Sequence, residues 1–88
     1  MDFSKIDIAK RILKVAGIPI PDDEGEIREK AYQYLLEKDF LAAHAIRLRR
    51  DWREFTRDDW KNIIQISGRE KVMSNIAAFR ACQMYGLL

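Results

Sequence analysis

The chain has 88 residues, of which 48% are hydrophobic and 34% charged, and its net charge is +2. This length fits one domain, and the composition is that of a globular protein rather than a disordered one. No apolar run approaches the roughly 20 residues of a membrane span, and charges interrupt the N-terminal stretch too often for a signal peptide. The one cysteine, Cys82, has no intrachain disulfide partner. We therefore expect a single helical domain over residues 1–88, in the cytoplasm and not in a membrane.

Charge is distributed unevenly along the chain. Residues 22–39 carry seven acidic and three basic side chains, whereas residues 40–57 carry five arginines and two acidic side chains. Two interpretations are open. The two blocks can neutralise each other between neighbouring helices, or they can form a dipolar surface whose basic side steers an anionic partner.

The first predicted helix begins at Ser4, because Ser4 and Asp7 have the spacing of a capping box. It ends at Gly17, which can adopt a positive φ without a clash, and Pro19 and Pro21 make residues 18–25 a connector. One face of this helix is apolar and consists of Ala9, Ile12, Leu13 and Ala16.

The second helix is predicted over residues 24–38, with Asp22 or Asp23 as its N-cap. Asp39 is the predicted N-cap of the next helix, so only a few residues link the two. A short link favours antiparallel neighbours, and we expect these two helices to form a hairpin. Continuation as one long helix is the alternative.

The third helix is predicted from Asp39 to Glu54 or Phe55. Its apolar residues recur at helical spacing and form a seam, and its arginines lie opposite that seam. The seam consists of Leu41, Ala45, Leu48, Trp52 and Phe55, and the arginine face consists of Arg47, Arg49, Arg50 and Arg53.

Two more helices are predicted in the C-terminal part. Thr56 and Asp59 have capping-box spacing at the start of the fourth helix, and Ser67 and Glu70 repeat that spacing around Gly68. The fifth helix would run to about Tyr85 and is apolar on nearly all sides, which is typical of a helix surrounded by others. No segment alternates with a period of two over a strand's length. The predicted fold is therefore a compact all-α bundle of about five short helices with the C-terminal helix at its centre.

The sequence contains few groups that could support catalysis. His44 is the only histidine and borders the apolar seam, so we interpret it as a core-edge residue. Cys82 lacks the context of a nucleophile and is interpreted as a small buried hydrophobe. One cysteine and one histidine cannot form a zinc site alone. We predict a protein that is not an enzyme and has no cofactor or metal.

Binding is better represented, and two functions remain. The first is a small nucleic-acid-binding or regulatory protein, with DNA favoured over RNA, since guanidinium groups match phosphate oxygens. Capped helices on both sides of Gly68 also have the outline of a helix-turn-helix. The alternative is a protein-interaction module, either an adaptor or a small inhibitor from a phage or other mobile element, able to self-associate as a homodimer. The candidate contact residues for nucleic acid or a protein partner are Arg47, Arg49, Arg50, Arg53, Arg57, Arg69 and Lys71.

Overall fold

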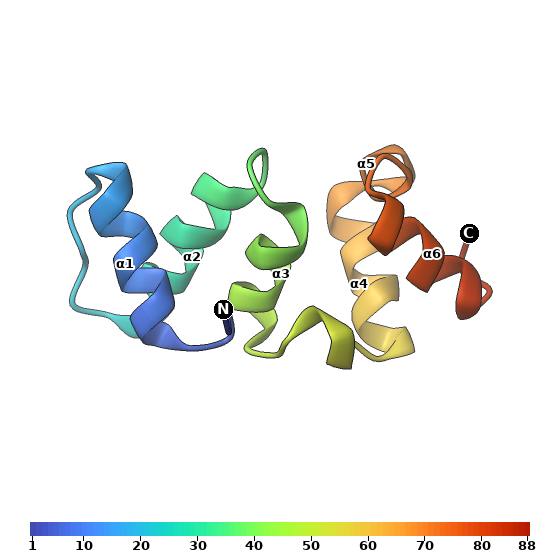
Figure 1. Ribbon diagram of the computed structural model, residues 1–88, viewed down its shortest axis with the longest axis horizontal. Helices are drawn as coiled ribbons and strands as arrows, with labels where there is room; N and C mark the ends of the chain where they lie inside the picture. The colour runs from blue at the N-terminus through green and yellow to red at the C-terminus, as the bar shows by residue number, and fades with distance from the viewer. The chain divides into compact units, whose positions relative to one another are not determined.

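The computed structural model describes residues 1–88 and is entirely helical, with six α-helices and one short 3₁₀ helix (Figure 1). Its contacts divide the chain into a first unit, Met1–Arg53, and a second unit, Glu54–Leu88. None of the helices has both the length and the apolar character that crossing a membrane requires. The two units are described separately below, and a single domain over residues 1–88 stays a prediction.

The first unit contains α1 (Ile6–Ala16), α2 (Glu24–Leu35) and α3 (Phe40–Leu48), and the 3₁₀ helix Trp52–Glu54 begins at its end. Helix α2 packs against both α1 and α3, and the chain reverses direction between α2 and α3 (Figure 1). The alternative of one long helix is therefore wrong. The core of this unit consists of Ala9, Leu13, Ile27, Ala31, Tyr32, Leu35, Ala42, Ala43 and Ile46.

Helix ends follow the sequence signals in some places and not in others. Asp23 accepts a hydrogen bond from the Glu26 amide, and Asp39 accepts one from the Ala42 amide, so both predicted N-caps are confirmed. The prediction for Ser4 is wrong, because its hydroxyl donates to Asp2 at 2.6 Å and α1 begins at Ile6 without a side-chain cap. An acid two residues before Ser4 has taken the hydroxyl that would have capped the helix.

The predicted long third helix is also wrong. Helix α3 stops at Leu48, because Arg49 adopts a left-handed conformation with φ 61° and the Arg50 amide donates back to the Ala45 carbonyl. This arrangement closes the helix in the manner of a Schellman motif. The Asp51 carboxylate then accepts from the Arg53 amide and starts the 3₁₀ helix. The seam and arginine face predicted for residues 39–55 consequently do not lie on one helix.

The second unit contains α4 (Arg57–Ser67), α5 (Arg69–Met73) and α6 (Ile76–Met84), which all contact one another. The fifth predicted helix is divided because the Asn75 side chain accepts from the Ala78 amide and caps a new helix. Ile76 is 70% exposed and Met84 is 87% exposed, so the C-terminal helix is not surrounded by others. The prediction that this helix lies at the centre of the bundle is therefore wrong. The buried side chains of this unit include Phe55, Trp60, Ile63, Val72, Ala78 and Cys82.

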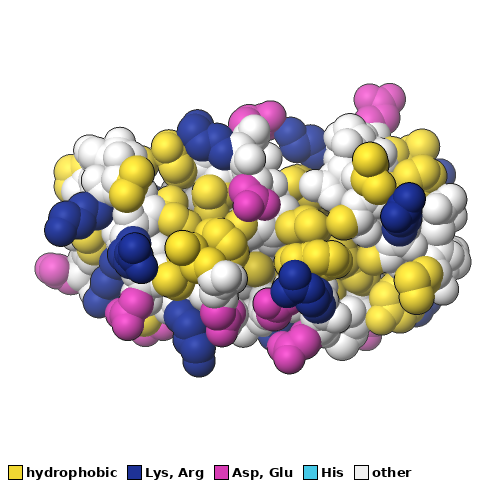
Figure 2. Space-filling model, in the orientation of Figure 1, with side chains coloured by type: hydrophobic (Ala, Val, Ile, Leu, Met, Phe, Trp, Pro, Cys, Tyr) yellow, Lys and Arg dark blue, Asp and Glu magenta, His cyan; other side chains and the backbone are white.

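Several large hydrophobic side chains reach the surface of both units, and Figure 2 shows hydrophobic groups interspersed with charged ones on one face. In the first unit the most exposed of them within a helix is Val15, at 86%. In the second unit Ile76 and Met84 are the most exposed. Exposed apolar side chains that cluster are a mark of contact surfaces.

The capping box of α4 supports a first prediction. The Thr56 hydroxyl accepts from the Asp59 amide at 3.2 Å, and the Asp59 carboxylate accepts from the Thr56 amide at 2.9 Å. Thr56→Ala should lower the free energy of unfolding of the second unit by about 1 kcal/mol, because an amide of the first turn loses its partner. Denaturant unfolding followed by Trp60 fluorescence measures the change, and Thr56→Ser should stay close to the wild type. Equal stabilities of the alanine variant and the wild type would contradict the role of this cap.

Candidate functional site

Three arginines converge near the start of α2 and the end of α3. Arg28, Arg47 and Arg49 line a hollow of about 130 Å³, together with Gly25 and Glu29, and we call these five residues the arginine hollow. Each arginine comes from a different position in the fold: Arg28 from the inner face of α2, Arg47 from the last turn of α3, and Arg49 from the residue that ends α3. With one acidic side chain among three guanidinium groups, the hollow is suited to an anion.

Arg28 is the most deeply buried charged residue of the hollow, with 8% of its surface exposed. Its Nη1 donates to the Ser4 carbonyl at 2.9 Å and to the Ile46 carbonyl at 3.1 Å, and its Nη2 pairs with Glu24 at 3.3 Å. The Nε atom is buried and has no hydrogen-bond partner. Arg28 thus joins the start of α1 to the end of α3.

Arg47 is held by the only histidine. Its Nη2 lies 3.0 Å from Nδ1 of His44, its Nε donates to the same atom at 3.3 Å, and its guanidinium lies 5.7 Å from the centre of the Tyr32 ring. Burial, and then the charge of Arg47, lower the pKa of His44 from 6.5 to about 4. His44 is therefore neutral near pH 7, and its Nδ1 can accept a hydrogen bond from the Arg47 guanidinium. His44, which the sequence indicated as a core-edge residue, is completely buried.

Arg49 is exposed and is the only residue other than glycine with a positive φ. Glycine or asparagine usually occupies such a helix-ending position, because a Cβ atom there costs about 1 kcal/mol or more. A strained backbone of this kind is often found where a side chain has a function. Arg50 follows it and is also exposed.

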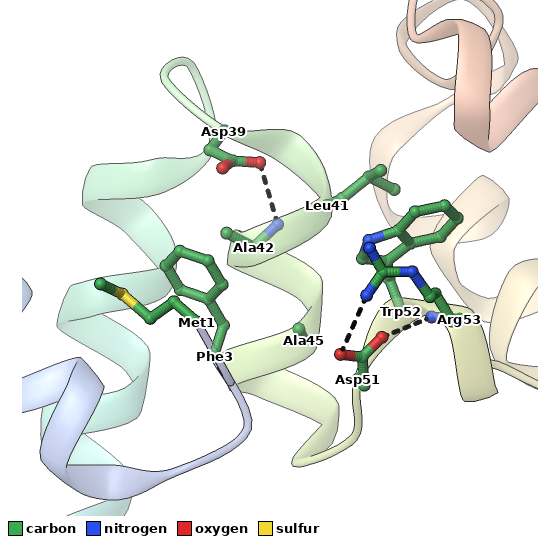
Figure 3. Close-up of a pocket in the computed structure, with 9 residues that line it drawn as sticks. All are labelled: Met1, Phe3, Asp39, Leu41, Ala42, Ala45, Asp51, Trp52 and Arg53. Carbon is green, nitrogen blue, oxygen red and sulfur yellow. Dashed lines mark hydrogen bonds and ion pairs between the residues drawn. The ribbon is translucent and has the colours of Figure 1, made fainter.

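Arg53 lies apart from the arginine hollow, beside a second hollow of about 260 Å³ that Figure 3 shows. Its guanidinium pairs with Asp51 at 3.6 Å and lies over the Trp52 ring at 5.3 Å from the ring centre. Asp51 thus neutralises Arg53 locally, whereas the arginine hollow carries a net positive charge. The residues around this second hollow are Met1, Phe3, Asp39, Leu41, Ala42, Ala45, Asp51, Trp52 and Arg53.

The remaining predicted contact residues belong to the second unit. Arg57 begins α4 and its Nε donates to the Tyr85 carbonyl at 3.4 Å, while Arg69 and Lys71 lie on α5 beside a shallow depression. Helix α5 has only five residues and is separated from α4 by Gly68 alone. The long recognition helix of the predicted helix-turn-helix is therefore not formed.

Sequence reasoning missed Arg28, although a signal was present. Arg28, Ala31, Tyr32 and Leu35 recur at helical spacing and are all buried, so Arg28 occupies a position on the apolar face. A charged residue in such a position needs buried partners, and this is a reason to examine it. The ion pair Arg28–Glu24 lies within α2, so both of its members belong to the acidic block of residues 22–39, and it does not join that block to the arginine block of residues 40–57.

Other kinds of site find less support. No group of three or more histidine, cysteine, aspartate or glutamate side chains could hold a metal ion. Cys82 is buried as a free thiol, and burial raises its pKa, which disfavours the reactive thiolate. No family model, curated protein or solved structure matches the chain.

Proposed function

We propose that this protein is a non-enzymatic, regulatory nucleic-acid-binding protein, and that the exposed edge of the arginine hollow contacts phosphate groups. The observation that carries this proposal is the convergence of Arg28, Arg47 and Arg49 on one hollow. Arg28 and Arg47 are held by internal hydrogen bonds, so their positive charge is fixed in place before a ligand arrives. Fixed donors lose little conformational entropy on binding, which favours affinity.

Arg49 and Arg50 are the side chains best placed to reach a phosphate, because both are exposed, Arg49 lines the hollow, and Arg50 follows it in the chain. The strained φ of Arg49 supports a role in binding, since glycine would end α3 at a lower cost. Duplex DNA is the first partner to test, with single-stranded DNA and RNA beside it. If phosphate contacts dominate, the affinity must fall steeply between about 50 and about 200 mM salt.

A single substitution separates stability from binding. Arg49→Gly should raise the free energy of unfolding by up to about 1 kcal/mol, because glycine adopts the left-handed conformation without strain. The same change should weaken binding to labelled duplex DNA by about fivefold, because one phosphate contact and its counterion release are lost. Fluorescence anisotropy and thermal unfolding measure the two effects.

Arg80→Gln is the matched control, since Arg80 is an exposed arginine on α6 of the second unit. It removes one positive charge and should leave affinity within about twofold of the wild type. Equal losses in the two variants would mean that only net charge matters, and unchanged binding in Arg49→Gly would refute the proposed contact. The double change Arg49→Glu with Arg50→Glu should abolish binding without unfolding the first unit.

The second candidate function is a protein-interaction module, in the form of an adaptor, a small inhibitor from a phage or other mobile element, or a homodimer. The exposed apolar side chains Val15 and Ile76 favour it. Light scattering across concentration tests self-association directly, since a dimer would double the mass. The free thiol of Cys82 fits a reducing compartment, and we propose the cytoplasm for either function.

A further inference from the structure

Helix α1 has two apolar stripes, of which only one is fully buried. Ala9 and Leu13 face the core and are fully buried. Ile8, Ile12 and Val15 form the second stripe, which lies at the spacing of a helix face and lines a separate hollow of about 200 Å³. Ile12 of this stripe packs partly against the core, whereas Val15 stays exposed.

The hollow beside this second stripe of α1 has apolar side chains at its base and basic side chains at its rim. Met1 and, from α2, Tyr34 and Leu35 complete its wall, and we call it the apolar hollow. Arg11, at its edge, is the only charged side chain that lines it. Lys38 lies beside it, with its Nζ 4.3 Å from the centre of the Tyr34 ring. None of the residues that line the apolar hollow is acidic.

We infer that the apolar hollow is a docking site for an acidic amphipathic helix of a partner protein. The inference deepens the second candidate function, protein recognition, and rests on it. An apolar stripe between two helices receives side chains spaced at i, i+3, i+4 and i+7 from a helix laid along it. Arg11 and Lys38 then meet acidic side chains on the flanks of that helix, so charge complementarity selects an acidic partner.

The burial of Val15 supplies part of the binding. This side chain is 86% exposed in the free protein, so covering it removes apolar surface from water without disturbing the fold. Val15→Asp should therefore leave the melting temperature close to the wild type while weakening the docking of such a helix by about tenfold or more. Met84→Asp is the matched control, because Met84 is 87% exposed and lies on α6 of the second unit.

The experiment uses the full chain and a synthetic helical peptide of about 18 residues, which is five turns. Leucines form one face of the peptide and glutamates flank them, and a second peptide carries lysines in place of the glutamates. We expect saturable binding of the acidic peptide, with NMR shifts at α1 and α2. We expect Val15→Asp to weaken this binding by about tenfold or more, Met84→Asp to preserve it, and Arg11→Glu to reverse the preference between the two peptides.

Other outcomes would overturn the inference. They are equal binding of both peptides, binding that Val15→Asp does not weaken, or Val15-dependent binding to anionic phospholipid vesicles but to neither peptide. Val15-dependent dimerisation that excludes the peptide would make a second copy of the chain the occupant instead. Cross-linking in a lysate tests this inference separately from protein recognition, the function on which it rests. If wild type and Val15→Asp capture the same partner, protein recognition holds and the apolar hollow is not its site.

Discussion

Replacing Arg28 with methionine should lower the free energy of unfolding of the first unit by about 3 kcal/mol, because two charge-assisted hydrogen bonds disappear. The guanidinium donates to the carbonyls of Ser4 and Ile46, at 2.9 and 3.1 Å, and methionine supplies no donor to either. Amide hydrogen exchange resolved by residue is the appropriate measurement, since it reports the first unit separately from the second.

Two further variants separate the possible causes of that loss. Glu24→Gln removes the charged partner of Arg28, but Glu24 is 56% exposed, so the expected loss is below about 1 kcal/mol. Arg28→Lys keeps the charge but cannot reach two carbonyls as a fork does, so its stability should fall between those of the wild type and Arg28→Met. A methionine variant as stable as the wild type would show that Arg28 is not the link between α1 and α3.

Acidification should destabilise the first unit between about pH 6.5 and pH 4, through protonation of His44. Its pKa falls from 6.5 to about 4 in the folded protein, because burial disfavours the imidazolium and Arg47 repels it. The unfolded chain therefore binds more protons across this interval, and stability is lost as the pH falls. The loss approaches about 3 kcal/mol below pH 4, since each unit of pKa is worth 1.36 kcal/mol.

Two aromatic rings and the Arg47 guanidinium lie against the imidazole of His44. The rings of Tyr32 and Phe40 lie edge-on at 5.2 and 4.7 Å from the imidazole, and Arg47 occupies Nδ1. Denaturant unfolding at a series of pH values measures the effect. His44→Gln should flatten the curve over this interval, because glutamine can accept from Arg47 but does not titrate. If the free energy of unfolding of the wild-type protein were constant from pH 7 to pH 4, that result would contradict this account.

Local signals in the sequence predicted several helix boundaries correctly. Asp23, Asp39 and Thr56 cap their helices as expected, and Gly17 ends α1 with φ 74°. Each of these features depends on a side chain and an amide a few residues away, or on the freedom of one glycine, so neighbouring residues suffice to specify it. Burial of Cys82 and Trp60 also followed from their place on apolar faces.

The candidate site could not be predicted in the same way. Periodicity favoured a helix through Trp52, and nothing near Leu48 in the sequence signals an end, since arginine is a good helix former. In a continuing helix the carbonyl of Ile46 would accept from the amide of Arg50. In the structure Arg28, from another helix, donates to that carbonyl, and the Arg50 amide turns back to Ala45.

The sequence by itself determined that this protein is helical and where most of its helices begin, because caps and apolar spacing act within one or two turns. Only the tertiary structure decided where α3 ends and which arginines meet, because a donor 18 residues away in sequence, Arg28, competes for a backbone carbonyl of α3. The division of the C-terminal segment is an intermediate case. Asn75 is a residue that can cap a helix, but the apolar residues around the whole segment favoured one continuous helix. In the structure the Asn75 side chain ends that continuity by capping α6.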